Sequence, residues 1–240
     1  MRIDYSIIVP AYNEEKWLPL TLESLHLAMG NIELSGEIIV VDNNSSDATA
    51  SVAEQAGARV VFEPVNQISR ARNAGAKVAM GKYFVFVDAD TLISTELLSR
   101  ALDNLSGNCC GGGVRVKFDH VERFSVRAGL AFWNGVSRRL RWAAGCFVYA
   151  RREGFEVVGG FSEQVYASEE IWFSRALRRW GKGQQLQFCI IDEYSAVSSR
   201  RKLEWFSTWQ QINLLLMCLL LPFFVRYKKL CSFWYTRPKE

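Results

Sequence analysis

Residues 5–10 read YSIIVP, and this short run decides the fold class of a chain of 240 residues. The run is continuously apolar and rich in β-branched side chains, which predicts a strand buried on both faces of a sheet. Further strands are predicted at 37–41 (EIIVV), 59–63 (RVVFE) and 82–87 (KYFVFV), with helices between the strands at 13–29, 48–56 and 69–80. Strands that alternate with helices imply parallel crossovers, so we expect an α/β fold with a Rossmann-like, mostly parallel sheet flanked by helices.

Composition and charge exclude several classes of protein. Apolar residues make up 49% and charged residues 22% of the chain, which excludes the disordered and fibrous classes. The formal net charge of +4 is too small to argue for nucleic acid, and no nucleic-acid partner is expected. None of the six cysteines forms a C-x-x-C pair, so we expect buried thiols in a reducing compartment and no zinc site. No export signal precedes the first strand, and the expected location is the cytoplasm.

Three polar segments follow the predicted strands, at 10–14 (PAYNE), 42–45 (DNNS) and 88–90 (DAD). Because ligands bind beyond the carboxyl ends of the strands in such sheets, we expect these segments to converge on one edge. Each segment taken alone has a simpler explanation, such as a helix cap at Asp42 or a solvated turn at 88–90. Their occurrence together after successive strands favours a ligand site.

The type of ligand is narrowed by motifs that the sequence lacks. No G-x-G-x-x-G follows the first strand, which argues against a dinucleotide site, and no P-loop occurs. Two carboxylates one residue apart, Asp88 and Asp90, suit a hard divalent cation such as Mn²⁺ or Mg²⁺, which prefers oxygen ligands and neutralises a diphosphate.

Five motifs in order resemble those of family 2 glycosyltransferases with the GT-A fold, over roughly residues 4–202. They are 6–15 (SIIVPAYNEE), 41–49 (VDNNSSDAT), 69–75 (SRARNAG), 87–91 (VDADT) and 159–161 (GGF) with 168–175 (SEEIWFSR). The resemblance implies a metal-dependent enzyme that transfers a sugar from a nucleotide-sugar donor, commonly a UDP-sugar, with inversion of the anomeric centre.

The resemblance also implies roles for individual residues. In matching members the nucleoside pocket is lined by residues corresponding to Pro10, Ala11, Tyr12 and Glu14. By the same resemblance Asp42 hydrogen-bonds the base, Arg72 approaches the nucleotide, Asp88 faces the ribose or the metal, and Asp90 ligates the metal. A Ser-x-Arg-Arg segment that folds over the diphosphate corresponds to Arg200 and Arg201, for which a solvated basic loop is the alternative.

Inversion by direct displacement needs one general base that accepts the proton of the acceptor hydroxyl. The family usually has an Asp as the second residue of its Glu-Asp motif, and Glu170 takes that place here. Glutamate is one methylene longer, so Glu169 stays open as the base. The alternative for both residues is an acidic pair that stabilises a helix N-terminus through the helix dipole.

Segment 115–152 holds nine basic residues against two acidic ones. Its arginines are interleaved with aromatic residues, which suits an anionic acceptor or an anionic membrane surface. The spacing of Phe132, Trp133, Val136 and Leu140 equally fits a helix that faces the core. The acceptor class stays open among a glycan, a lipid-linked molecule and a small molecule.

The carboxyl-terminal segment changes in composition. Residues 212–225 carry no charge, and Arg226, Lys228 and Lys229 follow them. Fourteen residues are fewer than the roughly 20 needed to span a bilayer, so we expect an apolar helix on the cytoplasmic face of a membrane. A homodimer contact and a helix packed on the domain's own core are the alternatives. The expected organisation is a GT-A domain at 1–202, with a donor half at 1–114 and an acceptor half at 115–202, followed by the segment 203–240.

Two other functions are compatible with the same residues. A non-catalytic scaffold or sensor that binds nucleotide sugars is favoured by the glutamate in the base position. A nucleotidyltransferase shares the sheet topology and the metal carboxylates, but its first loop needs a basic activating motif. Residues 11–15 hold acids and an aromatic residue instead.

Overall fold

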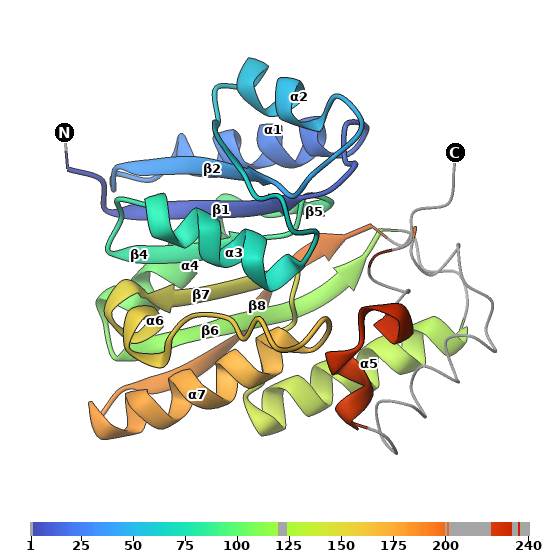
Figure 1. The fold of residues 1–240 in the computed structure, drawn as a ribbon. Coiled ribbons are helices and arrows are strands. Elements are labelled where there is room, and N and C mark those ends of the chain that lie inside the picture. Colours follow the sequence, from blue (N-terminus) through green and yellow to red (C-terminus); the bar gives the residue numbers. More distant parts are fainter. Residues whose placement is uncertain (1, 120–123, 200, 202–221, 232–234, 236–240) are drawn as a thin grey trace.

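The computed structural model describes residues 2–119, 124–199, 201, 222–231 and 235. Within these residues eight strands form one sheet in the order β3-β2-β1-β4-β7-β6-β8-β5. The strands are β1 (Tyr5–Ala11), β2 (Gly36–Asp42), β3 (Arg59–Phe62), β4 (Tyr83–Val87), β5 (Thr91–Leu92), β6 (Cys109–Phe118), β7 (Phe147–Arg151) and β8 (Gln187–Ser198). Helices pack on both sides of the sheet, so the molecule has three layers (Figure 1).

The helices divide between the two faces of the sheet. They are α1 (Leu18–Met29), α2 (Thr49–Gln55), α3 (Ile68–Val78), α4 (Thr95–Ser106), α5 (Phe124–Leu140), α6 (Arg152–Val158) and α7 (Glu169–Gly183), followed by the short 3-10 helices η1 (Pro222–Arg226) and η2 (Lys228–Cys231). Side chains from α1, α2 and α4 share one hydrophobic core with the sheet. Side chains from α3, α6 and α7 form a second core on the opposite face.

The alternation of side chains along β1 produces this arrangement. Ile7 and Val9 belong to the core beneath α1, α2 and α4, whereas Ile8 belongs to the core beneath α3, α6 and α7. All seven residues of β1 are buried. Successive side chains of a strand point to opposite faces, so an apolar run without interruption needs helices on both sides. The strand at 5–10 predicted as doubly buried is confirmed.

The predicted fold class is confirmed, with one addition to the topology. Strands β1, β2, β3 and β4 pair in parallel, as the alternation of strands and helices requires. β7 is antiparallel to both of its neighbours, β4 and β6, and β5 is antiparallel to β8. The first helix begins at Leu18 rather than at residue 13, because residues 13–15 bond to the loop after β2 instead of continuing a helix.

The carboxyl-terminal residues that the structure describes pack on the domain. Phe224 and Val225 are 1% and 6% exposed and lie against Val165 and Ala167. For these two residues the structure shows the alternative arrangement, in which the segment packs on the domain's own core. Residues 212–221 of the expected helix lie outside the described residues, so membrane contact of that part stays a prediction. Among the described helices, none has the length and hydropathy needed to cross a bilayer.

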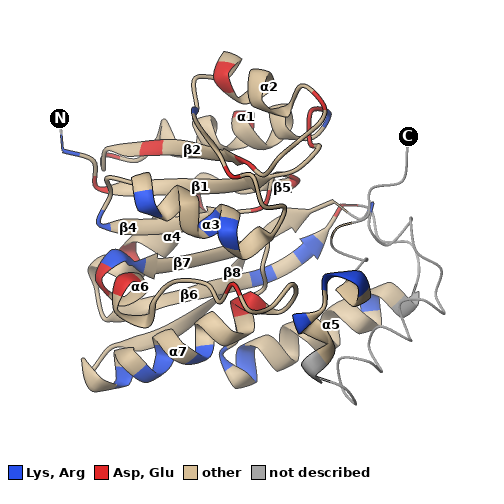
Figure 2. Cartoon of the chain, viewed as in Figure 1, with Lys and Arg blue, Asp and Glu red and all other residues tan. Residues whose placement is uncertain are grey.

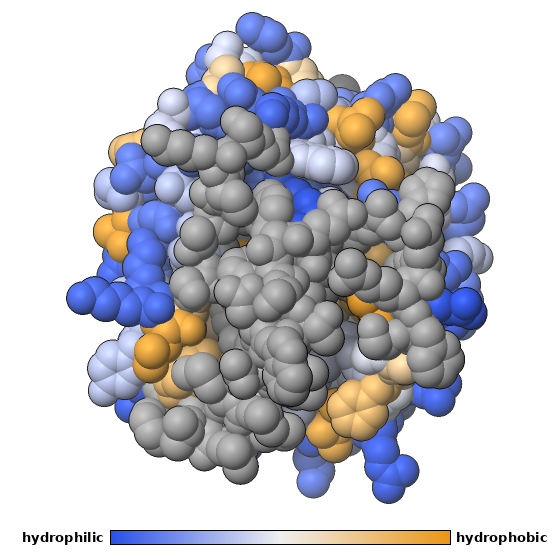
Figure 3. Space-filling view, turned by 90° about the vertical axis from the view of Figure 1, so that its right-hand side faces the viewer, coloured by the Kyte–Doolittle hydropathy of each residue, from blue (hydrophilic) through white to orange (hydrophobic). Residues whose placement is uncertain are grey.

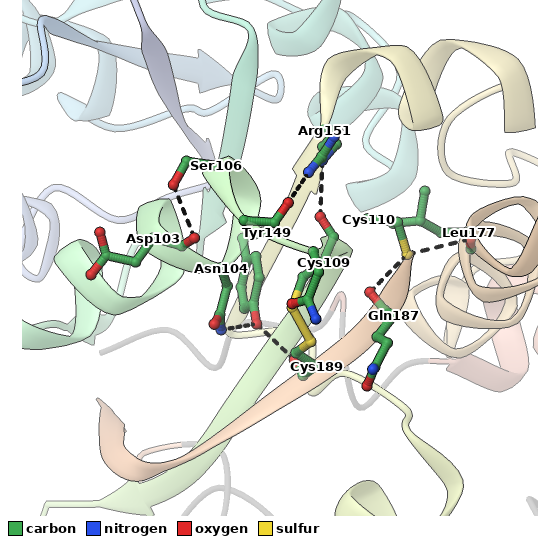
Figure 4. Close-up of a disulfide and its surroundings, with 12 residues drawn as sticks. Asp103, Asn104, Ser106, Cys109, Cys110, Tyr149, Arg151, Leu177, Gln187 and Cys189 are labelled. Carbon is green, nitrogen blue, oxygen red and sulfur yellow. Dashed lines mark hydrogen bonds between the residues drawn. A yellow bond between two sulfur atoms is a disulfide. The ribbon is translucent and has the colours of Figure 1, made fainter. Parts of the chain in front are cut away.

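A disulfide joins the first residues of β6 to β8, and it corrects the expectation that all cysteines are thiols. Cys109 and Cys189 are bonded across 80 residues of sequence. Tyr149 lies beside the bond, and its hydroxyl donates to the carbonyl of Cys189 (2.7 Å) and accepts from Asn104 (2.9 Å) (Figure 4). Sequence spacing gave no sign of this pairing, because the register between β6 and β8 is set by the sheet. Cys110 and Cys146 are buried free thiols, as expected, and Cys231 is buried as well.

The disulfide predicts a redox dependence of stability. Reduction should lower the free energy of unfolding by about 2–5 kcal/mol, because the bond closes a long loop in the unfolded chain. Urea unfolding with and without dithiothreitol measures the effect. Cys189→Ser should abolish the response to dithiothreitol, whereas Cys231→Ser should retain it. Equal midpoints for the wild-type protein in both conditions would contradict the bond.

Candidate functional site

The polar loops after β1, β2 and β4 meet at one edge of the sheet, as the sequence predicts. This edge opens onto the face seen in Figure 3, where the described residues around the margin are mostly hydrophilic and the hydrophobic ones form small separate groups. A cavity of about 60 Å³ lies among the loops. It is lined by Pro10, Ala11, Tyr12, Glu14, Asn43, Asn66, Ile68, Asp88, Ala89, Asp90 and Tyr235.

Hydrogen bonds between the loops after β1 and β2 fix this edge. The side-chain oxygen of Asn13 accepts from the backbone of Ser46 (2.8 Å), and the Asn13 backbone donates to the hydroxyl of Ser45 (3.0 Å). Asn13 has a φ of 52°, in the left-handed region that asparagine adopts more readily than most residues. The next residue, Glu14, donates its backbone N–H to Thr49 (2.8 Å) and turns its side chain inward, where it is 4% exposed.

Arg201 is buried at the same edge and pairs with two carboxylates. Its Nη2 donates to both oxygens of Glu14 and to Oδ2 of Asp90, the latter at 3.1 Å. Its guanidinium also lies 5.5 Å from the ring centre of Trp17. Burial by itself lowers the pKa of Arg201, but the charges of Asp90 and Glu14 outweigh burial and the pKa is raised overall. Arg201 therefore stays cationic and neutralises two acids of the site.

Arg72 holds a second group of acids together. Its Nη1 donates to Glu169 (2.6 Å), and its Nη2 donates to Asp88 (3.0 Å) and to the carbonyl of Gly145 (2.7 Å). The side chain is 1% exposed. Burial lowers the pKa of this guanidinium, yet the charges of Asp88, Glu169 and Glu170 raise it overall. Segments far apart in the sequence are thus tied together through one buried cation.

Helix α3 places Arg72 by packing close to the sheet. A Cβ at Gly75 would lie 2.4 Å from Ile8 and 2.9 Å from Val41, so only glycine allows this approach. Asn73, next to Arg72, exchanges two hydrogen bonds of 2.9 Å with the backbone of Phe161. The motif at 69–75 is therefore joined to the motif at 159–161 by a two-point clamp, and Phe161 in turn lies 5.1 Å below the Arg72 guanidinium.

Glu169 and Glu170 begin helix α7 in different surroundings. Glu169 is 4% exposed and is held by Arg72. Glu170 is partly exposed and takes part in no ion pair within the described part of the chain. Loss of hydration raises the pKa of Glu170 to about 8, the charge of Glu169 adds to the rise, and Arg72 opposes it. One glutamate is thus held in an ion pair, and the other has a pKa raised to about 8.

The acids of this edge fit a divalent cation only together with a bound diphosphate. Among the described residues no group of three or more His, Cys, Asp or Glu side chains is arranged to hold a metal. Mg²⁺ commonly uses one or two carboxylates together with substrate phosphates, and Asp88 and Asp90 supply carboxylates of that kind. Arg201 is already paired with Asp90, so a metal ion bound to this carboxylate would replace one positive charge with another.

The sequence-predicted residues take three kinds of position. Pro10, Ala11, Tyr12, Glu14, Asp88 and Asp90 line the cavity. Asp42 is buried behind it and accepts from the Ser45 backbone (3.0 Å), and Asn43 lines the cavity in its place. Arg72 lies beneath Asp88 with no exposed route to a ligand. Arg200 lies outside the described residues.

Sequence reasoning missed Tyr235. This residue lies more than 140 positions beyond the last acid of the first three polar loops, yet it lines the same cavity. Its hydroxyl accepts from the backbone of Ile68 (3.4 Å), its ring lies 5.9 Å from that of Tyr166, and burial raises its pKa. No local motif marks it, because only the docking of the carboxyl-terminal residues on Val165 brings it to the site.

The cavity is too small for a nucleotide. Its 60 Å³ compares with roughly 300 Å³ or more in ordinary ligand pockets. Arg201 sits across the two acids at one end, and Tyr235 forms part of the wall. A ligand of nucleotide size therefore requires displacement of side chains at this edge.

The fold and the site define a class of protein, and comparison with known families gives the same class. The sequence model for "Glycosyl transferase family 2" matches residues 6–160. That stretch is more than half of the chain and contains β1, β4, Arg72 and both aspartates of the cavity. The chain belongs to glycosyl transferase family 2.

Individual relatives match parts of the chain. An uncharacterised glycosyltransferase of Bacillus subtilis, EpsJ, is 34% identical over 109 residues, which are 43% of this chain and 30% of that protein. The glycosyltransferase AglE of Haloferax volcanii is 26% identical over 185 residues, 71% of this chain and 60% of the relative. The chain thus spans less than two thirds of the length of either relative.

Solved structures share the fold at low sequence identity. A crystal structure of Staphylococcus aureus TarS aligns with a TM-score of 0.63 at 19% identity, covering 83% of this chain and 61% of that one. The mannosyltransferase PcManGT of Pyrobaculum calidifontis, in complex with GDP-Man and Mn²⁺, aligns with a TM-score of 0.62 at 20% identity, covering 82% and 57%. The expected GT-A fold is confirmed.

The first prediction from the site compares two arginines on α3. Arg72→Gln should destabilise the fold by about 3–5 kcal/mol, because it leaves Asp88 and Glu169 without their buried cation. Arg70→Gln breaks a pair with Glu163 whose side chains are 40% and 41% exposed, and should cost less than about 1 kcal/mol. Urea unfolding measures both changes, and equal losses would argue against a structural role for the buried pair.

The second prediction concerns the proton on Glu170. The folded state holds this proton up to about pH 8, whereas the unfolded chain releases it near pH 4.5, so the stability of the wild type falls as the pH rises through that interval. Glu170→Gln should remove this part of the pH dependence. Compared with the wild type, the variant should gain more stability at pH 8 than at pH 5. Glu153→Gln, an exposed glutamate on α6, is the matched control and should keep the wild-type slope. An unchanged slope in Glu170→Gln would contradict the raised pKa.

Proposed function

We propose that this protein transfers a sugar from a nucleotide-sugar donor, with a UDP-sugar as the first candidate, to an acceptor hydroxyl with inversion. The observation that carries the proposal is the pair of unlike glutamates beside the acidic edge. Glu169 pairs with Arg72, whereas Glu170 forms no ion pair with any residue that the structure describes and has a raised pKa. An inverting displacement needs one proton acceptor near the donor site, and Glu170 meets that need.

The donor is proposed to bind at the cavity edge. Pro10, Ala11 and Tyr12 present an apolar wall with one aromatic ring, which suits a nucleoside. Asn43 and Asn66 add amide groups at the same cavity for polar groups of the base or ribose. Support for this class of ligand comes from fold neighbours whose structures contain UDP, UDP-GlcNAc and GDP-Man.

The diphosphate is proposed to meet Asp88 and Asp90 through a divalent cation. Mn²⁺ or Mg²⁺ bound there would stabilise the charge that develops on the leaving diphosphate. If a divalent cation were bound at Asp90, the Arg201 guanidinium that now pairs with this carboxylate would be available to donate to the phosphate oxygens. Glu14 keeps its position through the backbone bond to Thr49.

The proton of the acceptor hydroxyl is proposed to pass to Glu170. Burial raises the pKa of this carboxyl to about 8. A cation held at the neighbouring acidic edge would favour its ionised, basic form. Arg72 holds Asp88 and Glu169 in place through ion pairs, which leaves Glu170 as the proposed base.

A non-catalytic scaffold that binds nucleotide sugars is the second candidate. The feature that favours it is Glu170, which stands where family members usually have an aspartate as the base. The two candidates differ in turnover and agree in donor binding.

The test combines donor binding with turnover. UDP should raise the melting temperature more with Mn²⁺ than with EDTA, and Asp90→Asn should remove the difference. With UDP-sugars and Mn²⁺, release of UDP should fall by roughly 10²–10⁴ in Glu170→Gln, with little change in donor affinity.

The outcomes separate the candidates. Donor binding without release of UDP from a panel of acceptors would favour the scaffold. Inactivation by Glu169→Gln with a normal melting temperature, together with an active Glu170→Gln, would reverse the two roles. Equal stabilisation by UDP in Mn²⁺ and in EDTA would remove the metal from the proposal.

A further inference from the structure

A second hollow lies away from the cavity, between the last part of β6 and helix α5. It encloses about 590 Å³, nearly ten times the volume of the cavity at the donor edge. We call it the basic groove. Figure 2 shows Lys and Arg along the last part of β6 and on α5. The groove is lined mainly by Arg115, Lys117, Arg127, Leu130, Asn134 and Arg138, with Asp192 of β8 at its margin.

One face of α5 forms a wall of the groove. The lining residues of this helix are at positions 127, 130, 131, 134, 135 and 138. These positions recur every three or four residues, so they lie on a single face of the helix. The helix expected at Phe132 and Leu140 is confirmed, but its apolar face is divided: Trp133 packs against the core, whereas Phe132 is 69% exposed.

The groove has a fixed wall, because Asn134 attaches α5 to β6. β7 pairs with β6 only as far as Gly113, which leaves the backbone of Val116 without a strand partner on that side. The Asn134 amide takes the place of that strand: its oxygen accepts from Val116 N (3.1 Å), and its nitrogen donates to Val116 O (3.0 Å). Arg115 and Lys117 precede and follow Val116, so their side chains lie on one face of the strand and that of Val116 lies on the other.

The charges in the groove are not balanced. Asp192 pairs with Arg138 (3.0 Å), so the acid and the base at the margin neutralise each other. Arg115, Lys117 and Arg127 form no ion pair with any residue that the structure describes. Three positive charges around one groove attract an anion that carries at least two negative charges. A single carboxylate leaves two of them unpaired.

The groove also lies near the proposed reaction centre. Thr91, which follows Asp90, pairs with Ser198, and Ser198 pairs with Phe118 at the end of the groove. Two strand spacings put Phe118 about 10 Å from Thr91. Helix α5 ends at Leu140, and the chain continues to Gly145, whose carbonyl accepts a hydrogen bond from Arg72. A chain-like ligand in the groove can therefore reach the donor edge.

From these observations we infer that the basic groove binds the phosphate groups of the acceptor. The acceptor is a molecule with two or more phosphodiester charges, or one phosphate monoester, next to the hydroxyl that receives the sugar. Arg115, Lys117 and Arg127 pair with the phosphates, and Leu130 contacts the carbon chain between them. The role of this molecule as the acceptor rests on the proposed function, whereas the binding of phosphate in the groove does not.

The test measures binding of a fluorescent trimer of glycerol phosphate to the whole 240-residue chain by fluorescence anisotropy at low salt. Lys117→Gln and Arg127→Gln should each weaken binding about 3- to 10-fold, and 0.5 M NaCl should weaken it further. Arg139→Gln is the matched control, because Arg139 lies on the same helix outside the groove and is exposed. It should bind the trimer as the wild type does.

A second arm distinguishes a soluble acceptor from a lipid-linked one. Vesicles of phosphatidylcholine with phosphatidylglycerol carry the same glycerol phosphate group at a surface. Sedimentation with these vesicles that is lost in Lys117→Gln and Arg127→Gln, together with weak trimer binding, assigns the groove to a lipid headgroup. Tight trimer binding without sedimentation assigns it to a soluble phosphate-bearing acceptor.

Several results would overturn the inference. They are an absence of binding in both arms, an equal loss in Arg139→Gln, and tighter binding of a single-stranded oligonucleotide with the same number of phosphates. The binding of UDP with Mn²⁺ is measured on the same variants and should not change. Loss of UDP binding in the wild type would refute the proposed function, and the trimer result would still decide the groove.

Discussion

The buried guanidinium of Arg72 is the contact on which the rest of this site depends. It joins Asp88 after β4, Glu169 at the start of α7 and the loop carbonyl of Gly145. A buried cation with two carboxylates is stable only when all partners are present, because each charge left alone carries the full penalty of lost hydration. The close packing of α3 at Gly75 is what allows the side chain to reach so far into the molecule.

The same contact separates the properties of two neighbouring glutamates. Arg72 pairs with Glu169 and holds it in place, whereas burial, together with the charge of Glu169, raises the pKa of Glu170. Two identical side chains at adjacent positions therefore acquire different chemistry from their burial and their charged neighbours. A glycosyl transfer by direct displacement needs one carboxyl that accepts a proton, and a second carboxyl can then serve to hold the site together.

Arg201 plays a related part at the donor edge. It places a positive charge between Glu14 and Asp90 and so permits these two acids to be buried together. The cavity at this edge is too small for a nucleotide. The large groove beside α5 has the opposite character, with positive charges that lack acidic partners among the described residues. The two hollows thus differ in charge: in one the acids are already paired with Arg201, and in the other three basic side chains have no acidic partner among the described residues.

The sequence by itself determined the α/β class, the first four strands, the three helices between them and the convergence of three polar loops on one edge. These features are local or periodic: an apolar run such as 5–10 demands burial on both faces, and parallel strands bring their carboxyl ends together. The motif residues Tyr12, Asp88 and Asp90 reached the cavity for the same reason.

Only the tertiary structure decided the partners of those residues. The pairing of Arg72 with Glu169 spans 97 positions and that of Arg201 with Glu14 spans 187, and no local spacing encodes either. The Cys109–Cys189 bond depends on the register of β6 against β8, and the presence of Tyr235 in the cavity depends on how Phe224 packs against Val165. Pattern and composition specify which side chains must be buried. The residues that surround them are decided by contacts between distant elements, because charge pairing and packing act through space rather than along the chain.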